Sequence, residues 1–205
     1  MAANTFVEIE FAEAADLADL AGAQFDLNSA RFLSKTLKDN LETPNPNFSL
    51  VDPYSTAILV RYSRPFVTGV RKRLGEEVLS FLTKAQRKKH DRLRAFRDKH
   101  IAHSVNAFED NQPVGRYWVE RVAEEGITAV EVNQSRVIGL SSSDIEDVIE
   151  LTTTMLAHLD TRLLGEKARI LEIVRKMPID KVIGKSPKPM KGMDMAKIHK
   201  ARKRT

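Results

Sequence analysis

The sequence has no cysteine, few aromatic side chains and no long apolar run. The absence of cysteine among its 205 residues excludes a disulfide scaffold and any zinc or iron–sulfur site with cysteine ligands. The longest purely apolar stretch, AILV from Ala57, is far too short to span a membrane. The first residues, MAANTFVEIEFAEAAD, are acidic and lack the basic-then-apolar pattern of a signal peptide. We therefore expect a cytoplasmic protein with no membrane partner.

The composition is that of an ordinary globular protein, with 42% hydrophobic and 30% charged residues, and the length suggests one domain. The net charge of +5 is unevenly distributed. Residues 185–205 hold eight basic side chains and one acidic one, and residues 84–103 hold eight basic and two acidic ones, so the remainder carries −8. Locally positive segments are typical of proteins that bind phosphate-bearing partners, although a solvated helix surface with a solubilising tail gives the same pattern.

Helical spacing of apolar residues dominates the first part of the chain. Residues 10–41 predict one helix, whose apolar positions are Leu17, Leu20, Phe25, Phe32, Leu37 and Leu41. Asp52, followed by Pro53, predicts the N-cap of a second helix. Its apolar face continues to Leu74, with a kink at Pro65.

A capping-box pattern formed by Thr83 and Gln86 predicts a third helix, through residues 84–104. Residues 107–113 are expected to form a loop. The following stretch is rich in β-branched and aromatic residues and contains turn signals, which favours two or three short strands within 116–140.

A second capping-box pattern, Ser143 with Glu146, predicts the start of a last helix through residues 143–177. Unbroken, this helix would be about 50 Å long. Either Gly165 interrupts it, or its C-terminal half protrudes and packs on another subunit.

The predicted fold class is therefore mainly α: a bundle of four to five helices with a small hairpin-like insertion before the last long helix. Residues 1–177 would form this helical domain. Residues 178–205 contain several Pro and Gly residues beside the basic run, and predict a flexible basic tail.

The segment LRAFRDKHIAHS, Leu93 to Ser104, is the most informative part of the chain. On a helical wheel Leu93, Phe96, His100 and His103 fall within about 80° of one another, so the histidines continue an apolar seam. Arg97 lies about 60° from His100 and about 120° from His103 on that wheel. A half-buried histidine beside an arginine can act as an acid or base at neutral pH, although core-edge histidines bonded to the backbone or a carboxylate show the same spacing.

Arg97, Asp98 and His103 also carry a family resemblance. An arginine with a polar residue straight after it, separated by four to six residues from a histidine near the end of a helix in a small bundle, is similar to the motif of the HEPN superfamily (higher eukaryotes and prokaryotes nucleotide-binding). The segment RDKHIAHS resembles the corresponding sequence of the abortive-infection branch and its uncharacterised relatives. The resemblance extends over residues 10–177, with about a dozen specific positions.

This resemblance implies an all-α dimer and a metal-independent endoribonuclease of a toxin or phage-defence system. The two motifs would meet in one cleft across the dimer axis. Attack of an RNA 2′-hydroxyl on the adjacent phosphate would then use His103 as general base or acid, with Arg97 stabilising the phosphate charge. No cofactor or metal is implied, whereas an antitoxin or regulatory protein is a further expected partner.

An overlapping pair, Arg94 and His100, has the same spacing, but Ala95 follows Arg94 where the motif has a polar residue. His100 is therefore the alternative catalytic histidine. In one HEPN subgroup a tyrosine two residues after the motif histidine is modified by a partner enzyme; this chain has Val105 there, which does not support that scheme. The spacing of His100 and His103 also suits a metal, but the glutamate of the metalloprotease helix motif is missing.

Four basic residues are candidate RNA contacts: Arg94 and Lys99 on the basic helix, and Arg61 and Arg64 on the second helix. Arginines on a helix surface are more often simply solvated. Two hypotheses follow from the sequence: an endoribonuclease, and a helical module that binds RNA or a protein partner without chemistry.

Overall fold

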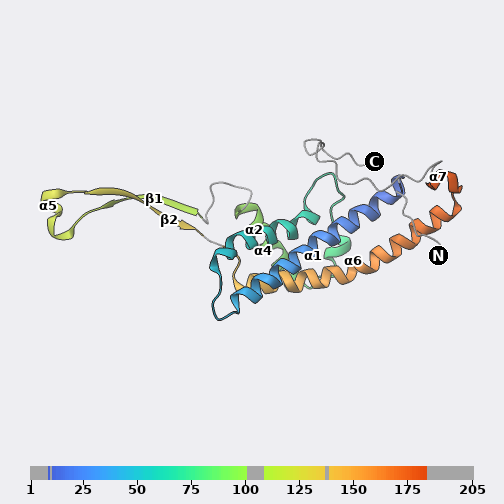
Figure 1. Cartoon of the computed structure of the whole chain (residues 1–205), viewed down its shortest axis with the longest axis horizontal. Coiled ribbons are helices and arrows are strands. Elements are labelled where there is room, and N and C mark those ends of the chain that lie inside the picture. The colour runs from blue at the N-terminus through green and yellow to red at the C-terminus, as the bar shows by residue number, and fades with distance from the viewer. Residues whose placement is uncertain (1–8, 10, 101–108, 137–138, 184–205) are drawn as a thin grey trace, which may run out of the picture.

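The computed structural model describes residue 9 and residues 11–100, 109–136 and 139–183, and it shows a mainly helical protein. Three long helices form the body: α1 (Ala15–Leu41), α4 (Lys84–His100) and α6 (Ser142–Lys176). The shorter α2 (Val51–Ser63) packs against α1 and α4. A two-stranded antiparallel hairpin precedes α6 and projects away from the body (Figure 1). The predicted fold class is therefore confirmed.

α1 is the helix around which the body is assembled, because it lies against both α2 and α6. Lys38 near its end pairs with Glu146 near the start of α6, whereas Gln24 pairs with Asp160, so the two helices run antiparallel. The predicted helix over 10–41 is confirmed apart from its first turn, which is the 3₁₀ turn η1 (Ala12–Ala14). The side chains of α1 that reach the core or are otherwise fully buried are Ala23, Asp26, Leu27, Ala30, Ser34 and Leu37.

The sequence pattern placed Phe25 and Phe32 on the apolar face of α1, and for these two residues the prediction is wrong. They are 64% and 69% exposed. The buried stripe instead passes through smaller side chains such as Ala23 and Ala30, which let α2 and α6 approach closely. Leu37 from the predicted pattern is buried, and Leu20 and Leu41 pack against the core, so only the two phenylalanines were misplaced.

The prediction of a long, kinked second helix is also wrong. α2 begins at Val51, so Asp52 lies inside its first turn rather than at the N-cap, which is Leu50. Asn47 caps the preceding 3₁₀ turn η2 (Phe48–Leu50) through its side chain. Pro65 lies in the 3₁₀ turn η3 (Arg64–Phe66), after which the chain leaves the helix. The proline thus ends the helix, since it cannot donate the hydrogen bond needed to continue it.

The capping box at Thr83 and Gln86 is confirmed: the Gln86 backbone N–H donates to the Thr83 hydroxyl at 3.2 Å, and the Thr83 N–H donates to Gln86 Oε1 at 3.0 Å. The short helix α3 (Glu76–Leu79) precedes it. α4 is described as far as His100, so the predicted continuation to residue 104 lies outside the described residues.

The N-cap of α6 lies two residues before the predicted one. Its capping box is formed by Ser141 and Asp144, not by Ser143 and Glu146. The helix then continues without interruption over 35 residues. Gly165 lies inside it, where a Cβ would meet no other atom within 4 Å. Gly165 therefore does not break the helix.

The hairpin is formed by β1 (Glu109–Arg116) and β2 (Ala129–Arg136), with the 3₁₀ turn η4 (Val119–Arg121) and the short helix α5 (Val122–Glu125) at its tip. β2 lies within the expected strand range 116–140, whereas β1 begins before it, so the loop expected over 107–113 is wrong from residue 109 onward. Pro113 was read as a sign of a loop. Both strands of a two-stranded sheet are edge strands, however, and edge strands tolerate proline.

The hairpin has one apolar face. Pro113 lies opposite Val132 and Gly115 opposite Val130, and the side chain of Ile127 covers Gly115. Val130 is 76% exposed, and no described side chain of the hairpin is buried. The hairpin therefore adds nothing to the core of the body.

The C-terminal end of the body is α6 followed by the short helix α7 (Ile179–Ile183). The expected tail over 178–205 is thus helical in its first residues, and residues 184–205 lie outside the described part of the chain. In that described part, no helix combines the length and apolar character needed to cross a membrane.

Candidate functional site

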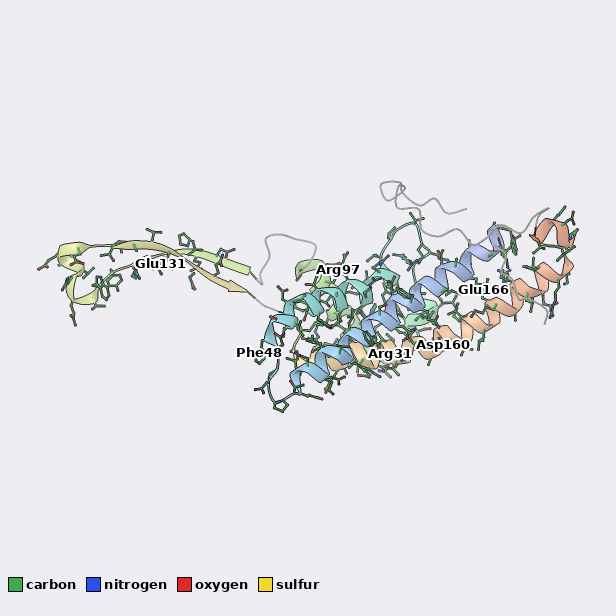
Figure 2. All side chains as sticks on the ribbon, in the orientation of Figure 1. Arg31, Phe48, Arg97, Glu131, Asp160 and Glu166 are labelled. Atoms are coloured by element: carbon green, nitrogen blue, oxygen red, sulfur yellow. The ribbon has the colours of Figure 1, made fainter. Side chains whose placement is uncertain are left out.

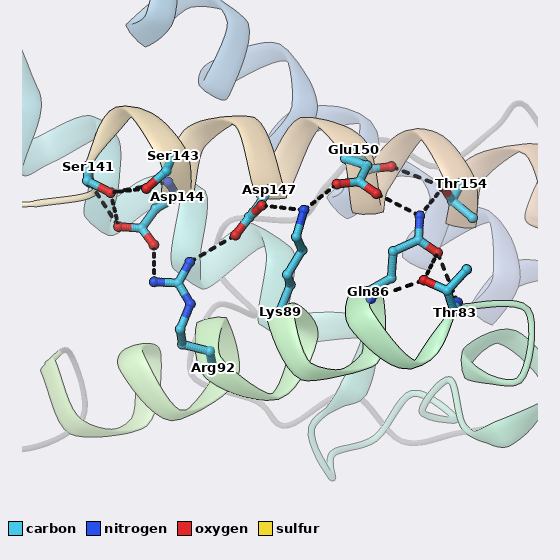
Figure 3. A network of polar contacts seen from close by, with 10 residues as sticks. All are labelled: Thr83, Gln86, Lys89, Arg92, Ser141, Ser143, Asp144, Asp147, Glu150 and Thr154. Carbon is cyan, nitrogen blue, oxygen red and sulfur yellow. Dashed lines mark hydrogen bonds and ion pairs between the residues drawn. The ribbon is translucent and has the colours of Figure 1, made fainter.

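The cations of α4 divide into two sets, of which one is bound to acidic neighbours (Figure 3). Lys89 lies 2.8 Å from Asp147 and 2.6 Å from Glu150, both on α6. Arg92 lies 2.5 Å from Asp144 and 2.9 Å from Asp147. These pairs fasten α4 to α6, and the hydrogen bonds with Asp147 and then Glu150 raise the pKa of Lys89. This part of the basic segment is therefore structural.

A third cation, Arg87, pairs with Glu76 of α3. Its side-chain hydrogen bonds lower the pKa of Glu76 and raise that of Arg87. With Lys89 and Arg92, it accounts for three of the eight cations that made the segment conspicuous in the sequence.

The second set consists of the other five cations of α4, none of which forms an ion pair with a described residue of α6: Lys84, Lys88, Arg94, Arg97 and Lys99. Lys88 and Lys99 are exposed, Arg94 is half-buried, and none of the three forms an ion pair with another described residue. Figure 2 shows Arg97 in the half of the body from which the hairpin leaves. The predicted RNA contacts Arg94 and Lys99 thus belong to the set of cations that α6 does not neutralise.

Arg97 is the motif arginine. Its side chain is 30% exposed, and its Nη1 donates to Asp98 at 2.9 Å. Its Nε is buried without a hydrogen-bond partner in the described structure. A neighbouring carboxylate therefore fixes one edge of the guanidinium, while the rest keeps donors that Asp98 does not use.

The motif histidine, His103, lies outside the described residues, as does the side chain of His100, the last residue of α4. Of the predicted catalytic residues, the structure thus places Arg97 and Asp98 together, and the side chains of the two histidines are not among those it describes. Among the described side chains, no group of three His, Asp or Glu gathers closely enough to hold a metal ion.

Arg61 and Arg64, the other predicted RNA contacts, are partly exposed and paired with a buried carboxylate. Together with Arg71 they converge on Asp26 of α1, whose side chain is only 2% exposed. Arg61 Nη1 donates to Asp26 Oδ1 at 2.9 Å, and Arg71 Nη1 donates to Oδ2 at 2.8 Å. Arg64 Nη1 lies 3.4 Å from Oδ1, close enough for an ion pair. We call Asp26, Arg61, Arg64 and Arg71 the arginine cluster.

Two neighbours on α1 shape the arginine cluster. A Cβ at position 22 would lie 2.6 Å from Cζ of Arg71, so glycine there leaves room for this guanidinium against the helix. The guanidinium of Arg61 lies over the exposed ring of Phe25, 5.8 Å from its centroid, within range of a cation–π interaction. The cluster combines three half-exposed cations, one buried anion and an exposed aromatic ring.

A third feature, which the sequence analysis missed, is a buried histidine. His90 packs edge-on against Phe66, with ring centroids 4.6 Å apart, and its Nδ1 lies 2.8 Å from the hydroxyl of Tyr62. Burial and, secondarily, the charge of Arg94 lower the pKa of His90 to about 4, while burial raises the pKa of Tyr62. His90 precedes Leu93 by three residues, and this spacing was the available signal of its burial.

Comparison of the chain with protein-family models, with curated proteins and with solved structures finds no match. The arrangement of its own residues therefore carries the functional argument.

Proposed function

We propose that this protein is a metal-independent endoribonuclease of HEPN type, acting as a homodimer in the cytoplasm as a toxin or phage-defence effector. Arg97 would bind the scissile phosphate and His103 would transfer protons. Asp98 would position the guanidinium of Arg97. Because the activity of such effectors has to be inhibited until it is needed, an antitoxin or another regulatory protein is a further partner in this proposal.

The observation that carries the proposal is the state of Arg97. Its neighbours Lys89 and Arg92 each meet two carboxylates of α6, whereas Arg97 meets only Asp98 among the described residues. A purely structural arginine would be expected to use its remaining donors in the same way as Arg92. The donors left over at Arg97 suit a phosphate, whose oxygens accept paired hydrogen bonds from a guanidinium.

The proposed reaction needs two chains. On a helix that extends through residue 104, as the sequence predicts, Arg97 and His103 would diverge by about 120°, so one chain would not direct both at one phosphate. A two-fold axis beside the end of α4 supplies the missing groups from the partner subunit. One histidine would take the proton of the 2′-hydroxyl as its oxygen bonds to phosphorus, and the other would protonate the departing 5′-oxygen.

The products are then a 2′,3′-cyclic phosphate and a 5′-hydroxyl end, with no water or metal consumed. The phosphate carries an additional negative charge in the transition state, and arginine stabilises it there more than in the ground state. This difference is what would make Arg97 catalytic rather than only a binding residue.

The second candidate function is a module that binds RNA or a protein partner without cleaving RNA. The arginine cluster favours it, since the cluster gathers cations at a site remote in sequence from Arg97. This module would bind RNA with a strong dependence on salt, and the binding would survive His103→Ala.

The deciding experiment is cleavage of a labelled RNA by purified protein in EDTA. Wild type should release fragments with 2′,3′-cyclic phosphate ends, and Arg97→Ala and His103→Ala should each abolish cleavage without changing the dimer or the thermal unfolding curve. His199→Ala is the matched control, and Arg94→Ala with His100→Ala tests the overlapping pair. Full activity of both motif variants would contradict the proposal, and loss of cleavage only in Arg94→Ala and His100→Ala would transfer it to the other pair.

A further inference from the structure

The arginine cluster contains more positive charge than its buried carboxylate requires. Asp26 has one negative charge and receives direct hydrogen bonds from Arg61 and Arg71, one on each carboxylate oxygen. Arg64 adds a third guanidinium at 3.4 Å from Oδ1, outside the hydrogen bonds of the carboxylate. The cluster therefore has a local charge of +2, and Arg64 is the member that Asp26 needs least.

The excess charge is accessible. The side chains of Arg61, Arg64 and Arg71 are 37%, 48% and 33% exposed, whereas that of Asp26 is 2% exposed. The anion thus lies beneath the guanidiniums, and their outer donors face solvent. Each guanidinium has five N–H donors, so most of the donors in the cluster remain for a ligand after Asp26 is bound.

The cluster is also held in place before any ligand arrives. Asp26 fixes Arg61 and Arg71, and the missing side chain at Gly22 gives Arg71 its place on α1. Long cationic side chains normally lose conformational entropy when they bind a ligand. Because the buried carboxylate already restrains two of the three guanidiniums, this cost is reduced for an anion that binds here.

An exposed aromatic ring lies at the edge of the same cluster. Phe25 is 64% exposed and lies under the guanidinium of Arg61. Proteins that bind single-stranded nucleic acid combine cations for the backbone with aromatic rings on which bases stack. A double-stranded helix keeps its bases stacked on one another, so a lone exposed ring favours a single strand.

We propose that the arginine cluster binds a backbone phosphate of single-stranded RNA, with Phe25 as the platform for an adjacent base. The inference rests on the proposed function in that it takes RNA as the substrate. It adds the class of RNA, a single strand, and a contact on residues far from Arg97 in sequence. The arginine cluster would hold the strand while the motif residues cleave it elsewhere.

Binding of a fluorescently labelled single-stranded RNA to the full chain carrying His103→Ala tests the proposal, because no cleavage interferes. Arg64→Ala removes the outermost cation and leaves both hydrogen bonds of Asp26 in place. Its matched control is Arg73→Ala, since Arg73 is exposed, follows the cluster closely in sequence and forms no ion pair with a described residue. Phe25→Ala is paired with Phe48→Ala, whose ring is equally exposed but lies on η2.

Arg64→Ala should weaken binding about three- to tenfold and reduce the slope of log K against log salt concentration by about 0.7. Phe25→Ala should weaken it about fivefold or more. Arg73→Ala and Phe48→Ala should bind as the parent does, and a duplex RNA should bind more weakly than the single strand. Equal losses in Arg64→Ala and Arg73→Ala, or equally good displacement of the RNA by polyglutamate, would overturn the proposal.

The outcome is separable from that of the cleavage assay. If wild type does not cleave RNA but the binding pattern holds, the endoribonuclease proposal fails and the RNA site stands. If wild type cleaves RNA and Arg64→Ala changes neither binding nor KM, the cleavage proposal stands and the site fails.

Discussion

The hydroxyl of Tyr62 on α2 and the Nδ1 atom of His90 on α4 lie 2.8 Å apart in the interior of the body. Both side chains are fully buried, and this contact is a polar link between two helices that otherwise meet through apolar side chains. The other ring nitrogen of His90, Nε2, is buried without a partner. Burial disfavours the protonated imidazole, and the charge of Arg94 opposes it further, so the pKa of His90 is lowered to about 4.

This relationship predicts an acid-sensitive fold. In the unfolded chain His90 takes up a proton near pH 6.5, while in the folded chain it does so only near pH 4, so acidification stabilises the unfolded state. The stability present above pH 6.5 should fall between pH 6.5 and pH 4, by roughly 3 kcal/mol for this one group. Urea unfolding at a series of pH values measures it.

His90→Gln serves as the control for that loss, because an amide can still bond the Tyr62 hydroxyl but does not titrate. Wild type and variant should converge in stability as the pH is lowered from 7 to 4. A constant difference over this range would contradict the assignment of the acid sensitivity to His90.

A second prediction concerns Asp26. Asp26→Asn removes the charge that holds Arg61 and Arg71, and it should lower the free energy of unfolding by roughly 2 kcal/mol. Arg64→Ala should cost less than about 1 kcal/mol, because Arg64 is half-exposed and forms no hydrogen bond to Asp26. Chemical denaturation of the two variants compares these values; equal losses would mean that Arg64 is a structural member of the cluster.

A third prediction concerns the hairpin. Replacing residues 109–136 by a short Gly-Ser link should change the free energy of unfolding by less than about 1 kcal/mol, since none of its described side chains is buried against the body. The ends of the excised segment are paired, Glu109 with Arg136, so a short link can join them. A large loss of stability in monomeric protein would show that the hairpin supports the bundle.

A fourth prediction separates positioning from catalysis. Asp98 fixes Arg97 through a 2.9 Å hydrogen bond, so Asp98→Asn should lower kcat roughly ten- to hundredfold with little change in KM. Arg97→Ala should remove activity altogether, and Asp98→Glu should recover part of it. An equal loss in Asp98→Asn and Asp98→Glu would contradict a positioning role.

The sequence predicted those features of the fold that depend on residues close together in the chain. The Thr83–Gln86 capping box and the helix over 10–41 are local, and both are confirmed. At α6 two overlapping capping patterns competed, and Ser141 with Asp144 was selected over Ser143 with Glu146. The two patterns have similar N-cap propensities, so the sequence alone does not rank them.

The arginine cluster could not be predicted in the same way. Arg61 and Arg71 lie 35 and 45 residues from Asp26, and only the packing of α1 against α2 and the following turn brings them together. A partial signal was available, because Asp26 lies on the buried stripe of α1 between Ala23 and Ala30. A carboxylate at a core position needs a cationic partner, and the arginines of the second helix were the candidates.

The most direct test of the central claim is the cleavage of RNA in EDTA by wild type and by His103→Ala, with the chemistry of the new ends determined. We expect cleavage by wild type only, with 2′,3′-cyclic phosphate and 5′-hydroxyl ends, at unchanged dimer content and unfolding temperature. Undiminished cleavage by His103→Ala, or wild-type cleavage that stops when divalent metal is removed, would contradict it.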